Sequence, residues 1–577
     1  MQRKDFMWSA ESIVAALCCS CGRSVAVFSA KMASLFFVIR SLSIKYIFTA
    51  VIFSILLGLS PAYSLSNERP NIVFIMADDL GPGDVAYYAN TFAKKRPLYP
   101  TPTMDALAKE GIWFTDAHSS TALCSPTRYC VMSGNLNYRS YAPWGVWGTF
   151  RKNAISSDEA TLGTVTKDAG YITGFIGKWH LGGDYRDKST GRIYRGDDRG
   201  NPDITADLTT IVDGGPQSLG FDYSLTLPCG IQGPIYTVYE NGKWFPLSGD
   251  SKIVYLDEKT AVDPKFISDK GPGMGDSHWD AREIGKLISS KAVDFINHNA
   301  GKKPFFLCYW SPTVHLPHCP PKEFDGLKIA NTTPSRHLDM VLDLDQQVAR
   351  IVKALKENDV YTNTLLIFTS DNGGLNGDPD TRKAGHDSSG QWRGFKNSPH
   401  EGGTRVPFIA VWPGRIKAGK VCDEPVAGHD ILATLAALVG TEVPDDQAMD
   451  SLNILPLLLG DKKKDFQKRE DLLLQGGSHN EVIYRQGPWK LIIQSNHTCT
   501  QWDPVALFHL EDNPTEVEAS NLIDKPEHQA RVQDMLKTYL DIRKSKKRTV
   551  PASPKPVFSG ASKRALNDNR EPEGLWF

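Results

Sequence analysis

The sequence predicts an α/β fold with a mostly parallel central sheet, because short apolar runs alternate with helical patterns along the chain. The runs at 71–77, 304–310 and 364–369 are continuously apolar, which is typical of strands that are buried on both faces. The segments at 103–109 and 338–355 instead repeat their apolar residues at helical spacing. Strands that alternate with helices in this way indicate a parallel sheet that is covered by helices.

The composition is that of a large globular protein. The chain has 577 residues, is 41% hydrophobic and has a mean hydropathy of −0.31. Its 65 Lys and Arg residues balance 66 Asp and Glu residues. Nucleic acid is therefore not expected as a partner, because phosphate binding needs an excess of basic groups. An anionic substrate would need a local cluster of basic side chains.

The first 64 residues have the pattern of a signal peptide or presequence. An apolar run at 46–59 follows Arg40 and Lys45, and it ends at the small-residue segment 61–64. The run is short for a membrane span. We expect export to the periplasm or the extracellular medium, with no stable membrane insertion after cleavage. The alternative is a membrane anchor that is not cleaved.

The character of the chain changes near residue 460. We expect a main domain at 65–460, a C-terminal α+β subdomain at 461–548 and a surface tail at 549–577. The segment 481–494 is typical of a hairpin that turns near Gly487, and 527–544 has the pattern of an amphipathic helix with a basic end.

Oxygen-bearing side chains follow two of the predicted strands. Asp78 and Asp79 come directly after one strand, and Asp371 and Asn372 follow another. In an open parallel sheet, sites form beyond the carboxyl ends of the strands. Oxygen donors without His or Cys suit Ca²⁺ or Mg²⁺ better than Zn²⁺. Each pair alone is more often a loop or helix cap than a metal ligand.

The segment 123–128 predicts the start of a helix, with Ser125 as the N-cap and Pro126 in the first turn. Cys124 would then lie at the positive end of the helix, where an anion or a developing negative charge is stabilised. The alternative is a buried structural cysteine beside a helix cap.

This segment also carries a resemblance to a known family. Cys124, Pro126 and Arg128 match the Cys-x-Pro-x-Arg motif by which type I sulfatases acquire formylglycine. The surrounding signature is similar throughout, although Ser133 stands where Thr is commoner. Further segments resemble family motifs in the expected order: 170–180, 315–318, 393–396 and 401–407. The resemblance runs from about residue 69 to 490, and it identifies the chain as an arylsulfatase-like, formylglycine-dependent member of the alkaline-phosphatase superfamily.

The resemblance implies an alkaline-phosphatase-like sandwich of α/β layers and a set of site residues. One calcium ion would be held by Asp78, Asp79, Asp371, Asn372 and the modified Cys124. The implied catalytic residues are Cys124, Arg128, Lys178, His180, His315 and Lys396. Lys178 and Lys396 would grip sulfate oxygens, Arg128 and His180 would hold the formylglycine hydrate, and His315, rather than the nearby His318, would protonate the leaving alcohol. A formylglycine-generating enzyme would act on the chain during maturation.

Formylglycine has a chemical rationale. Sulfate monoesters hydrolyse very slowly in water, so much developing charge must be stabilised. A plain Ser or Cys nucleophile would keep a sulfate that is hard to remove. The hydrate has two hydroxyls on one carbon: one attacks sulfur, and the other then expels sulfate as the aldehyde re-forms.

Two other functions remain open at the level of sequence, as does the substrate. The same scaffold supports phosphoester hydrolases, although these usually show Ser or Thr as nucleophile and more histidines at two metals. A non-catalytic glycan-binding protein is disfavoured because every expected catalytic position is filled. A sulfated carbohydrate is favoured over a small sulfate ester, with segments 138–147 and 375–392 as specificity loops or as ordinary surface loops. Aromatic platforms and charged groups in these segments would suit a sulfated sugar, and Trp144, Trp147 and Trp392 are their tryptophans.

Overall fold

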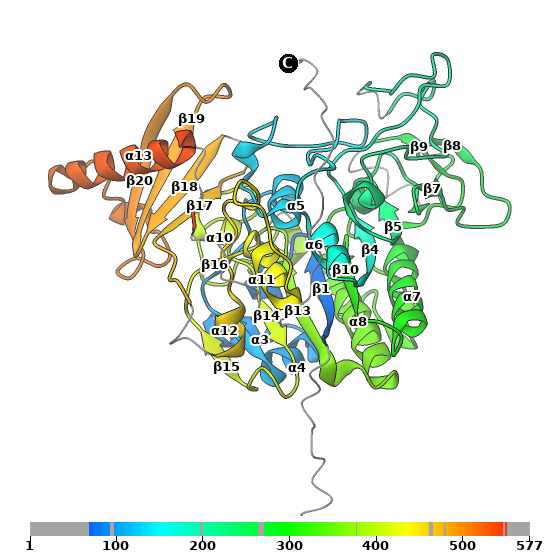
Figure 1. The fold of residues 1–577 in the computed structure, drawn as a ribbon, viewed down its shortest axis with the longest axis horizontal. Helices are drawn as coiled ribbons and strands as arrows, with labels where there is room; N and C mark the ends of the chain where they lie inside the picture. Colours follow the sequence, from blue (N-terminus) through cyan, green and yellow to red (C-terminus); the bar gives the residue numbers. More distant parts are fainter. Residues whose placement is uncertain are drawn as a thin grey trace, which may run out of the picture. The chain divides into compact units, whose positions relative to one another are not determined.

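A ten-stranded sheet forms the centre of the computed structural model (Figure 1). Its strands, in pairing order, are β15 (Lys420–Cys422), β2 (Ile112–Phe114), β14 (Ile409–Val411), β13 (Thr364–Ser370), β1 (Asn71–Ala77), β10 (Phe305–Trp310), β4 (Ile172–Lys178), β5 (Tyr223–Leu227), β6 (Tyr239–Glu240) and β7 (Lys243–Trp244). The five strands from β13 to β5 run parallel, and antiparallel pairs lie towards both edges. The predicted α/β class with a mostly parallel sheet is confirmed.

The structure describes residues 69–92, 97–196, 200–262, 271–376, 378–460, 466–477, 480–545 and 549–550. The predicted signal peptide at 1–64 lies outside the described residues, as does the predicted tail beyond residue 550. In the part of the chain that is described, none of the helices has the length and apolar character to cross a membrane.

Helices cover both faces of the sheet, and the side chains of β1 show how. Val73 and Ile75 join the core beneath α4 (Pro102–Glu110), α7 (Ala281–Asn299) and α8 (Arg336–Glu357). Phe74 and Met76 point to the opposite face and pack with α5 (Cys124–Ser133), α6 (Leu162–Asp168) and α11 (Asp430–Val439). Because β1 is buried on both faces, its sequence is continuously apolar, as predicted.

The two helices predicted from their spacing are present as α4 and α8. Ser335 caps α8, because its Oγ accepts a hydrogen bond from the backbone N–H of Leu338 at 3.3 Å. The smaller elements are α3 (Ala86–Phe92), β3 (Ala117–His118), β8 (Ile253–Leu256), β9 (Gly273–Asp276), β11 (Glu323–Phe324), β12 (Leu327–Lys328), α9 (Pro379–Lys383), α10 (Glu401–Thr404), β16 (Val426–Ala427) and α12 (Leu455–Leu459).

A four-stranded antiparallel sheet with one covering helix follows in the C-terminal part of the chain (Figure 1, orange to red). Its elements are β17 (Asp471–Gln475), β18 (Glu481–Gln486), β19 (Trp489–Ser495), β20 (Trp502–His509) and α13 (Gln529–Lys544). The predicted hairpin is β18–β19, and its turn contains Gly487 at φ 56°, a conformation that glycine adopts at no steric cost. Tyr484 and Leu491 pack on Met535 and Tyr539 of α13.

Candidate active site

Three parallel strands bring candidate residues to one edge of the central sheet. Asp78 follows β1, Asp371 follows β13 and Lys178 is the last residue of β4. The backbone N–H of Asp371 donates to the carbonyl of Ala77 at 3.1 Å, so the first two strand ends are joined directly. The carboxyl ends of parallel strands meet at the same edge, which gathers residues almost 300 positions apart.

The helix α5 starts at Cys124, so the predicted N-cap Ser125 was wrong: Leu123 takes the N-cap position. Ser125 instead lies inside the first turn, where its hydroxyl donates to the carbonyl of His180 at 2.8 Å and accepts from the N–H of Trp147 at 3.0 Å. These bonds hold His180 beside Cys124, with 3.4 Å between the Cys124 Sγ and the His180 Nδ1. Cys124 therefore does lie at a helix N-terminus, as expected.

Arg128 lies one turn after Cys124 and is fully buried. Its guanidinium donates to the carbonyl of Lys178 at 2.9 Å and to Asp371 Oδ2 at 2.6 Å, and it lies 5.3 Å from the ring centroid of Trp310. The planar fork of Arg suits such paired contacts. Arg128 thus ties the start of α5 to the ends of β4, β13 and β10.

Both candidate lysines form ion pairs with the aspartates that follow β1. Lys178 Nζ lies 2.7 Å from Asp78 Oδ2, and Lys396 Nζ lies 2.7 Å from Asp79 Oδ1. Asn372 Nδ2 donates to the same oxygen of Asp79 at 2.8 Å. The three carboxylates and three cations of the site balance, so the lysines are already neutralised by aspartates. A divalent cation that took up these carboxylates would leave the lysines available for an anion.

The two histidines of the 315–318 segment face different surroundings. His315 Nε2 lies 3.6 Å from Asp79 Oδ2, within the cluster. His318 Nδ1 lies 3.3 Å from Asp378 Oδ2, and its Nε2 lies 3.4 Å from His337 Nδ1. The structure therefore brings His315, rather than His318, into contact with the candidate metal ligands.

Two buried oxygen atoms test whether the site fits a metal ion. Asp78 Oδ1 and Asn372 Oδ1 have no hydrogen-bond partner among the described residues. Burying an oxygen atom without a partner raises the free energy of the folded state, so such atoms usually bind an ion or a water molecule. Asp79 and Asp371 complete an all-oxygen donor set, the type that Ca²⁺ and Mg²⁺ prefer. Burial raises the pKa of Cys124, the fifth predicted ligand, and the nearby Asp78 and Asp371 raise it further against the effect of Lys178 and Lys396.

The carboxylates of the site are far from ordinary aqueous groups. Burial raises the pKa of Asp78, and the neighbouring Asp371 raises it further against the effect of Lys178. Burial also acts to raise the pKa of Asp79, but Lys396 and other nearby cations outweigh it and hold that pKa well below its usual range. A bound cation would relieve the repulsion between these carboxylates.

The two site histidines are held in the neutral form. Burial and then Lys178 bring the pKa of His180 well below 6.5. Burial and then Lys396 do the same for His315. A neutral imidazole can accept a proton, and the negative charge of a bound sulfate would favour that change.

Small differences in exposure show from which side a substrate can approach. The residues Asp78, Asp79, Asp371, Asn372 and Lys178 are 0% exposed, whereas Cys124, His180, His315 and Lys396 are 4%, 6%, 6% and 9% exposed. The three aspartates, Asn372 and Lys178 therefore form the floor of the site, and Cys124, His180, His315 and Lys396 lie nearer to solvent.

The tryptophans of the two candidate specificity loops are not exposed aromatic platforms. Trp144, Trp147 and Trp392 are buried. Trp144 packs against the C-terminal sheet, and its Nε1 donates to the carbonyl of His497 at 2.8 Å. Trp147 packs on the ring of Tyr129. Their large apolar rings stabilise the core, because burial of aromatic surface contributes more than an exposed platform would.

Sequence reasoning missed a contact between the C-terminal sheet and the nucleophile segment. The carbonyl of Gln475, in β17, accepts from the N–H of Ala122 at 3.0 Å, and the carbonyl of Ala122 accepts from the N–H of Asn397 at 2.8 Å. A Cβ on Gly477 would lie 2.2 Å from the Asn397 Cα, so glycine is required there. The end of β17 thus supports the residues that precede Cys124 and follow Lys396.

Lys490 is a second missed residue. It is 0% exposed on β19, and its Nζ lies 2.9 Å from Glu401 Oε1 and 2.7 Å from Glu516 Oε1. Glu401 begins α10, five residues after Lys396. A lone lysine within the apolar run 489–493 was the signal that could have found it.

Replacing Lys490 with methionine should lower the free energy of unfolding by about 3–5 kcal/mol, because the buried Glu516 would lose its lysine and the buried Glu401 would keep only Arg405, at 2.6 Å. Urea denaturation of the purified chain measures this effect. Lys537→Met is the matched control, since Lys537 pairs with Asp541 on the exposed face of α13, where it should matter little. Similar unfolding midpoints for the two variants would show that the buried cluster is not stabilising.

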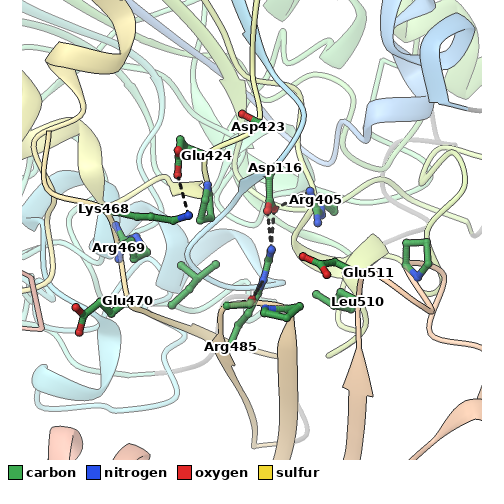
Figure 2. Close-up of a pocket in the computed structure, with 15 residues that line it drawn as sticks. Asp116, Arg405, Asp423, Glu424, Lys468, Arg469, Glu470, Arg485, Leu510 and Glu511 are labelled. Atoms are coloured by element: carbon green, nitrogen blue, oxygen red, sulfur yellow. Dashed lines mark hydrogen bonds and ion pairs between the residues drawn. The ribbon is translucent and has the colours of Figure 1, made fainter. Parts of the chain in front are cut away.

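Another cavity, of about 350 Å³, is lined by many charged side chains, and Figure 2 shows how they lie. Asp116 lies between Arg405 and Arg485, with ion-pair distances of 2.7 Å to both. Lys468 pairs with Glu424 at 3.9 Å. Because these cations are paired with carboxylates, the cavity does not have the free positive charge of an anion site. It lies where the central part of the chain meets the C-terminal sheet.

Comparisons with known proteins agree with this arrangement. The Sulfatase family matches residues 70–441, and the family described as N-sulphoglucosamine sulphohydrolase, C-terminal, matches residues 390–546. An N-acetylgalactosamine-6-O-sulfatase of Bacteroides thetaiotaomicron is 31% identical over 76% of this chain and 85% of its own. The rat steryl-sulfatase is also 31% identical, over 68% of this chain and 70% of its own.

A solved structure shows the same fold. It comes from work on the metabolism of multiple glycosaminoglycans by Bacteroides thetaiotaomicron, and it is 29% identical, with a TM-score of 0.67 over 83% of this chain and 100% of that chain. The fold is thus the alkaline-phosphatase-like fold of the sulfatases, with the small antiparallel C-terminal sheet. The chain belongs to the sulfatase family and is a sulfuric ester hydrolase.

Proposed function

We propose that this chain hydrolyses the sulfate ester of a sulfated carbohydrate, using formylglycine at position 124 and one bound calcium ion. The observation that carries the proposal is the placement of Cys124. It lies at the N-terminus of α5, with its Sγ 3.4 Å from His180 Nδ1; burial raises the pKa of its thiol, while the nearby Lys178 and Lys396 act to lower it.

The absent groups would each supply a definite chemistry. Bound calcium, held by Asp78, Asp79, Asp371, Asn372 and the modified residue 124, would polarise a sulfate oxygen. Formylglycine supplies a nucleophilic hydroxyl together with a second hydroxyl through which sulfate can be released.

The side chains of this protein bind and orient the sulfate group. Lys178 pairs with Asp78 and Lys396 pairs with Asp79. As compact cations, both lysines would bind the sulfate oxygens. Arg128 orients the start of α5 through Asp371 and the carbonyl of Lys178. The neutral His180 would accept a proton from the side chain at position 124.

His315 is the proposed proton donor to the leaving oxygen. Its Nδ1 donates to the carbonyl of Leu316 at 2.5 Å, so Nε2 is the nitrogen that faces the site. This nitrogen would carry the transferable proton once the negative charge of a bound sulfate has favoured protonation of the neutral ring. A sugar alcohol is a poor leaving group because its pKa is high, and it therefore needs this proton.

The proposed substrate class rests on similarity. The N-acetylgalactosamine-6-O-sulfatase matches a larger share of this chain than the steryl-sulfatase does, and the solved relative comes from work on glycosaminoglycan metabolism. A sulfated glycan is therefore proposed over a steroid sulfate. Export to the periplasm or cell exterior, maturation by a formylglycine-generating enzyme, and the domain division at 65–460 and 461–548 belong to the same proposal.

Mass spectrometry of the peptide that contains position 124 tests the nucleophile. The mass of an aldehyde at position 124, together with labelling by an aminooxy probe, is expected; unmodified cysteine in an active preparation would refute it. Sulfate release from defined sulfated monosaccharides and disaccharides, with a steroid sulfate for comparison, tests the substrate class. Faster turnover of the steroid sulfate would overturn the carbohydrate proposal.

Replacing His315 with alanine should slow hydrolysis of a sugar sulfate far more than hydrolysis of nitrophenyl sulfate, by a further ~10²-fold or more. The reason is that nitrophenol leaves readily without a proton. Comparison of kcat/KM on the two substrates measures the difference. His318→Ala is the control and should show no such selectivity; equal losses on both substrates for His315→Ala would exclude a general-acid role.

A further inference from the structure

Asp84, His337 and His386 form a second cluster of potential ligands. His337 Nε2 and His386 Nε2 both face Asp84 Oδ1, at 3.1 Å and 2.8 Å. Asp84 ends the short helix η1 (Pro82–Asp84), His337 lies in the first turn of α8, and His386 follows α9. Ser388 Oγ lies 3.3 Å from His337 Nε2. Three elements distant in sequence thus direct two imidazoles and a carboxylate at one point.

This donor set differs from that of the active site. The active site offers oxygen atoms, whereas this cluster offers two imidazole nitrogens and one carboxylate oxygen, all within 4.8 Å of one another. Imidazole with carboxylate suits Zn²⁺ and related transition metals rather than Ca²⁺. We propose that Asp84, His337 and His386 bind a divalent transition metal ion such as Zn²⁺, separate from the calcium site.

The surroundings of the cluster have the pattern seen around metal-bound histidines. His337 Nδ1 lies 3.4 Å from His318 Nε2, and His318 Nδ1 lies 3.3 Å from Asp378 Oδ2. The second oxygen of Asp84 accepts from the N–H of Gly81 at 2.9 Å. A second layer of partners of this kind fixes ring orientation and tautomer in metal sites.

The protons along these contacts predict what metal binding would release. Without a metal, three hydrogen bonds each need one proton: His318 Nδ1 to Asp378, His337 Nε2 to Asp84, and one between His318 Nε2 and His337 Nδ1. Two neutral rings carry only two protons, so one of the two rings would have to be protonated. Proton positions here follow from the partners of each nitrogen. With a metal on His337 Nε2, Nδ1–H of His337 can donate to His318, and Nδ1–H of His318 to Asp378. Both rings are then neutral, so one proton is released; His386 changes tautomer and releases none.

A cavity provides access to the cluster. It has a volume of about 310 Å³ and is lined by Asp84 and His386 together with Gly83, Tyr99 and Asp387. Three protein ligands with an open side leave a position for water or another small ligand on the ion. The cavity thus reaches two of the three ligands, Asp84 and His386, and it would give the ion an entry path and a place for a further ligand on that side.

A bound ion would secure the segment that lies behind the active site. Ser388 accepts, through its carbonyl, from the N–H of Gly83 at 2.8 Å, and the carbonyl of Gly374 accepts from the N–H of Lys396 at 3.0 Å. A Cβ on Gly374 would lie 2.5 Å from the Ser388 Cβ, which shows how closely these segments pack. The ion would therefore clamp residues around 386–388 next to the loop that carries Lys396.

A second histidine–carboxylate group shows what a purely structural cluster looks like. Asp116, His118 and Glu401 also lie within 4.8 Å of one another. Their carboxylates, however, are already paired with Arg405, Arg485 and Lys490. A cation would have to compete with these permanent charges. The partners of Asp84 are instead two histidines, which can lose a proton and become neutral ligands. This difference favours metal binding at Asp84.

The test is titration of the full-length, calcium-saturated protein with Zn²⁺ and, for spectroscopy, Co²⁺. One equivalent of metal above calcium is expected, with the visible absorption of Co²⁺ bound by nitrogen. Calorimetry at about pH 6, in buffers of different ionisation enthalpy, should show release of about one proton for each Zn²⁺. Failure of the wild-type protein to bind Zn²⁺ with a Kd below roughly 100 µM would overturn the proposal without the use of any variant.

Variants then locate the ion. His337→Gln and His386→Gln should abolish the Co²⁺ absorption, and His318→Gln should weaken Zn²⁺ binding by about 10–100-fold. His278→Gln is the matched control, because His278 pairs with Asp250 at the surface. Unchanged Zn²⁺ affinity in both His337→Gln and His386→Gln would place the ion elsewhere and refute the site.

Discussion

Replacing Cys124 with alanine is expected to abolish hydrolysis, with kcat lower by about 10⁴–10⁶-fold. The variant cannot form formylglycine, so the hydroxyl that attacks sulfur is absent while the cations that bind sulfate remain. Ion chromatography of released sulfate measures the loss, and thermal unfolding should show that the fold is retained. Cys124→Ser should be equally inactive in a host that converts only cysteine.

A second cysteine on the same helix provides the control. Cys130 is also buried in α5, but it packs in the core among α5, α6 and α11 instead of facing His180. Cys130→Ala should therefore reduce stability slightly and leave turnover close to that of the wild type. The proposed mechanism would be refuted by Cys124→Ala activity within tenfold of wild type.

The central sheet could be predicted from sequence because its middle strands are buried on both faces. Asn71–Ala77 was predicted to the residue, and the strand at 364–370 extends one residue beyond its prediction. The candidate site followed from the same pattern, since Asp78 and Asp371 come directly after these strands. A strand end is a local feature, and the parallel arrangement then fixes which edge it occupies.

The errors have a common physical cause. Ser125 was expected as an N-cap from its own neighbours, but its hydroxyl bonds to the carbonyl of His180 instead. Trp144 and Trp147 were expected in an exposed loop, but the C-terminal sheet and the core cover them. In each case a partner distant in sequence overrides the local preference.

Other features could not be predicted because they depend on pairing between remote segments. Lys490 and Glu401 are 89 residues apart, and Ala122 and Gln475 are 353 apart. The charge of Lys490 gains its partners only after β19 has paired with its neighbours and the main core has folded. His337 and His386 carry no local motif either, and the fold alone brings them to Asp84.

Replacing Asp371 with asparagine is expected to lower kcat/KM by at least about 10³-fold, because a metal ion that polarises the substrate is worth several kcal/mol. The variant keeps the size of the side chain but loses the charge that would hold calcium. Calcium binding to the folded state stabilises the wild type by about 2.7 kcal/mol at 100 times the Kd, which appears as a calcium-dependent rise in Tm. This rise should be much smaller in Asp371→Asn.

Asp343→Asn is the matched control for a buried carboxylate. Burial raises the pKa of Asp343 to about 7, and its carboxylate accepts from Gln347 on the same helix, α8, away from the predicted metal ligands. This change should leave the calcium-dependent rise in Tm intact.

Asp371 could act as a calcium ligand or only as the ion-pair partner of Arg128, and the Tm measurement separates these two roles. The guanidinium of Arg128 lies 2.6 Å from Asp371 Oδ2, so Asp371→Asn also leaves this fully buried cation with only the more distant carboxylate of Asp78, at 3.8 Å. That loss alone would lower Tm equally with and without calcium, since it acts on the folded state in both conditions. Loss of the calcium-dependent part of Tm, together with loss of activity, therefore identifies Asp371 as a ligand. A variant that is inactive but still gains the full calcium-dependent rise would show that Asp371 acts through Arg128 and does not hold the ion.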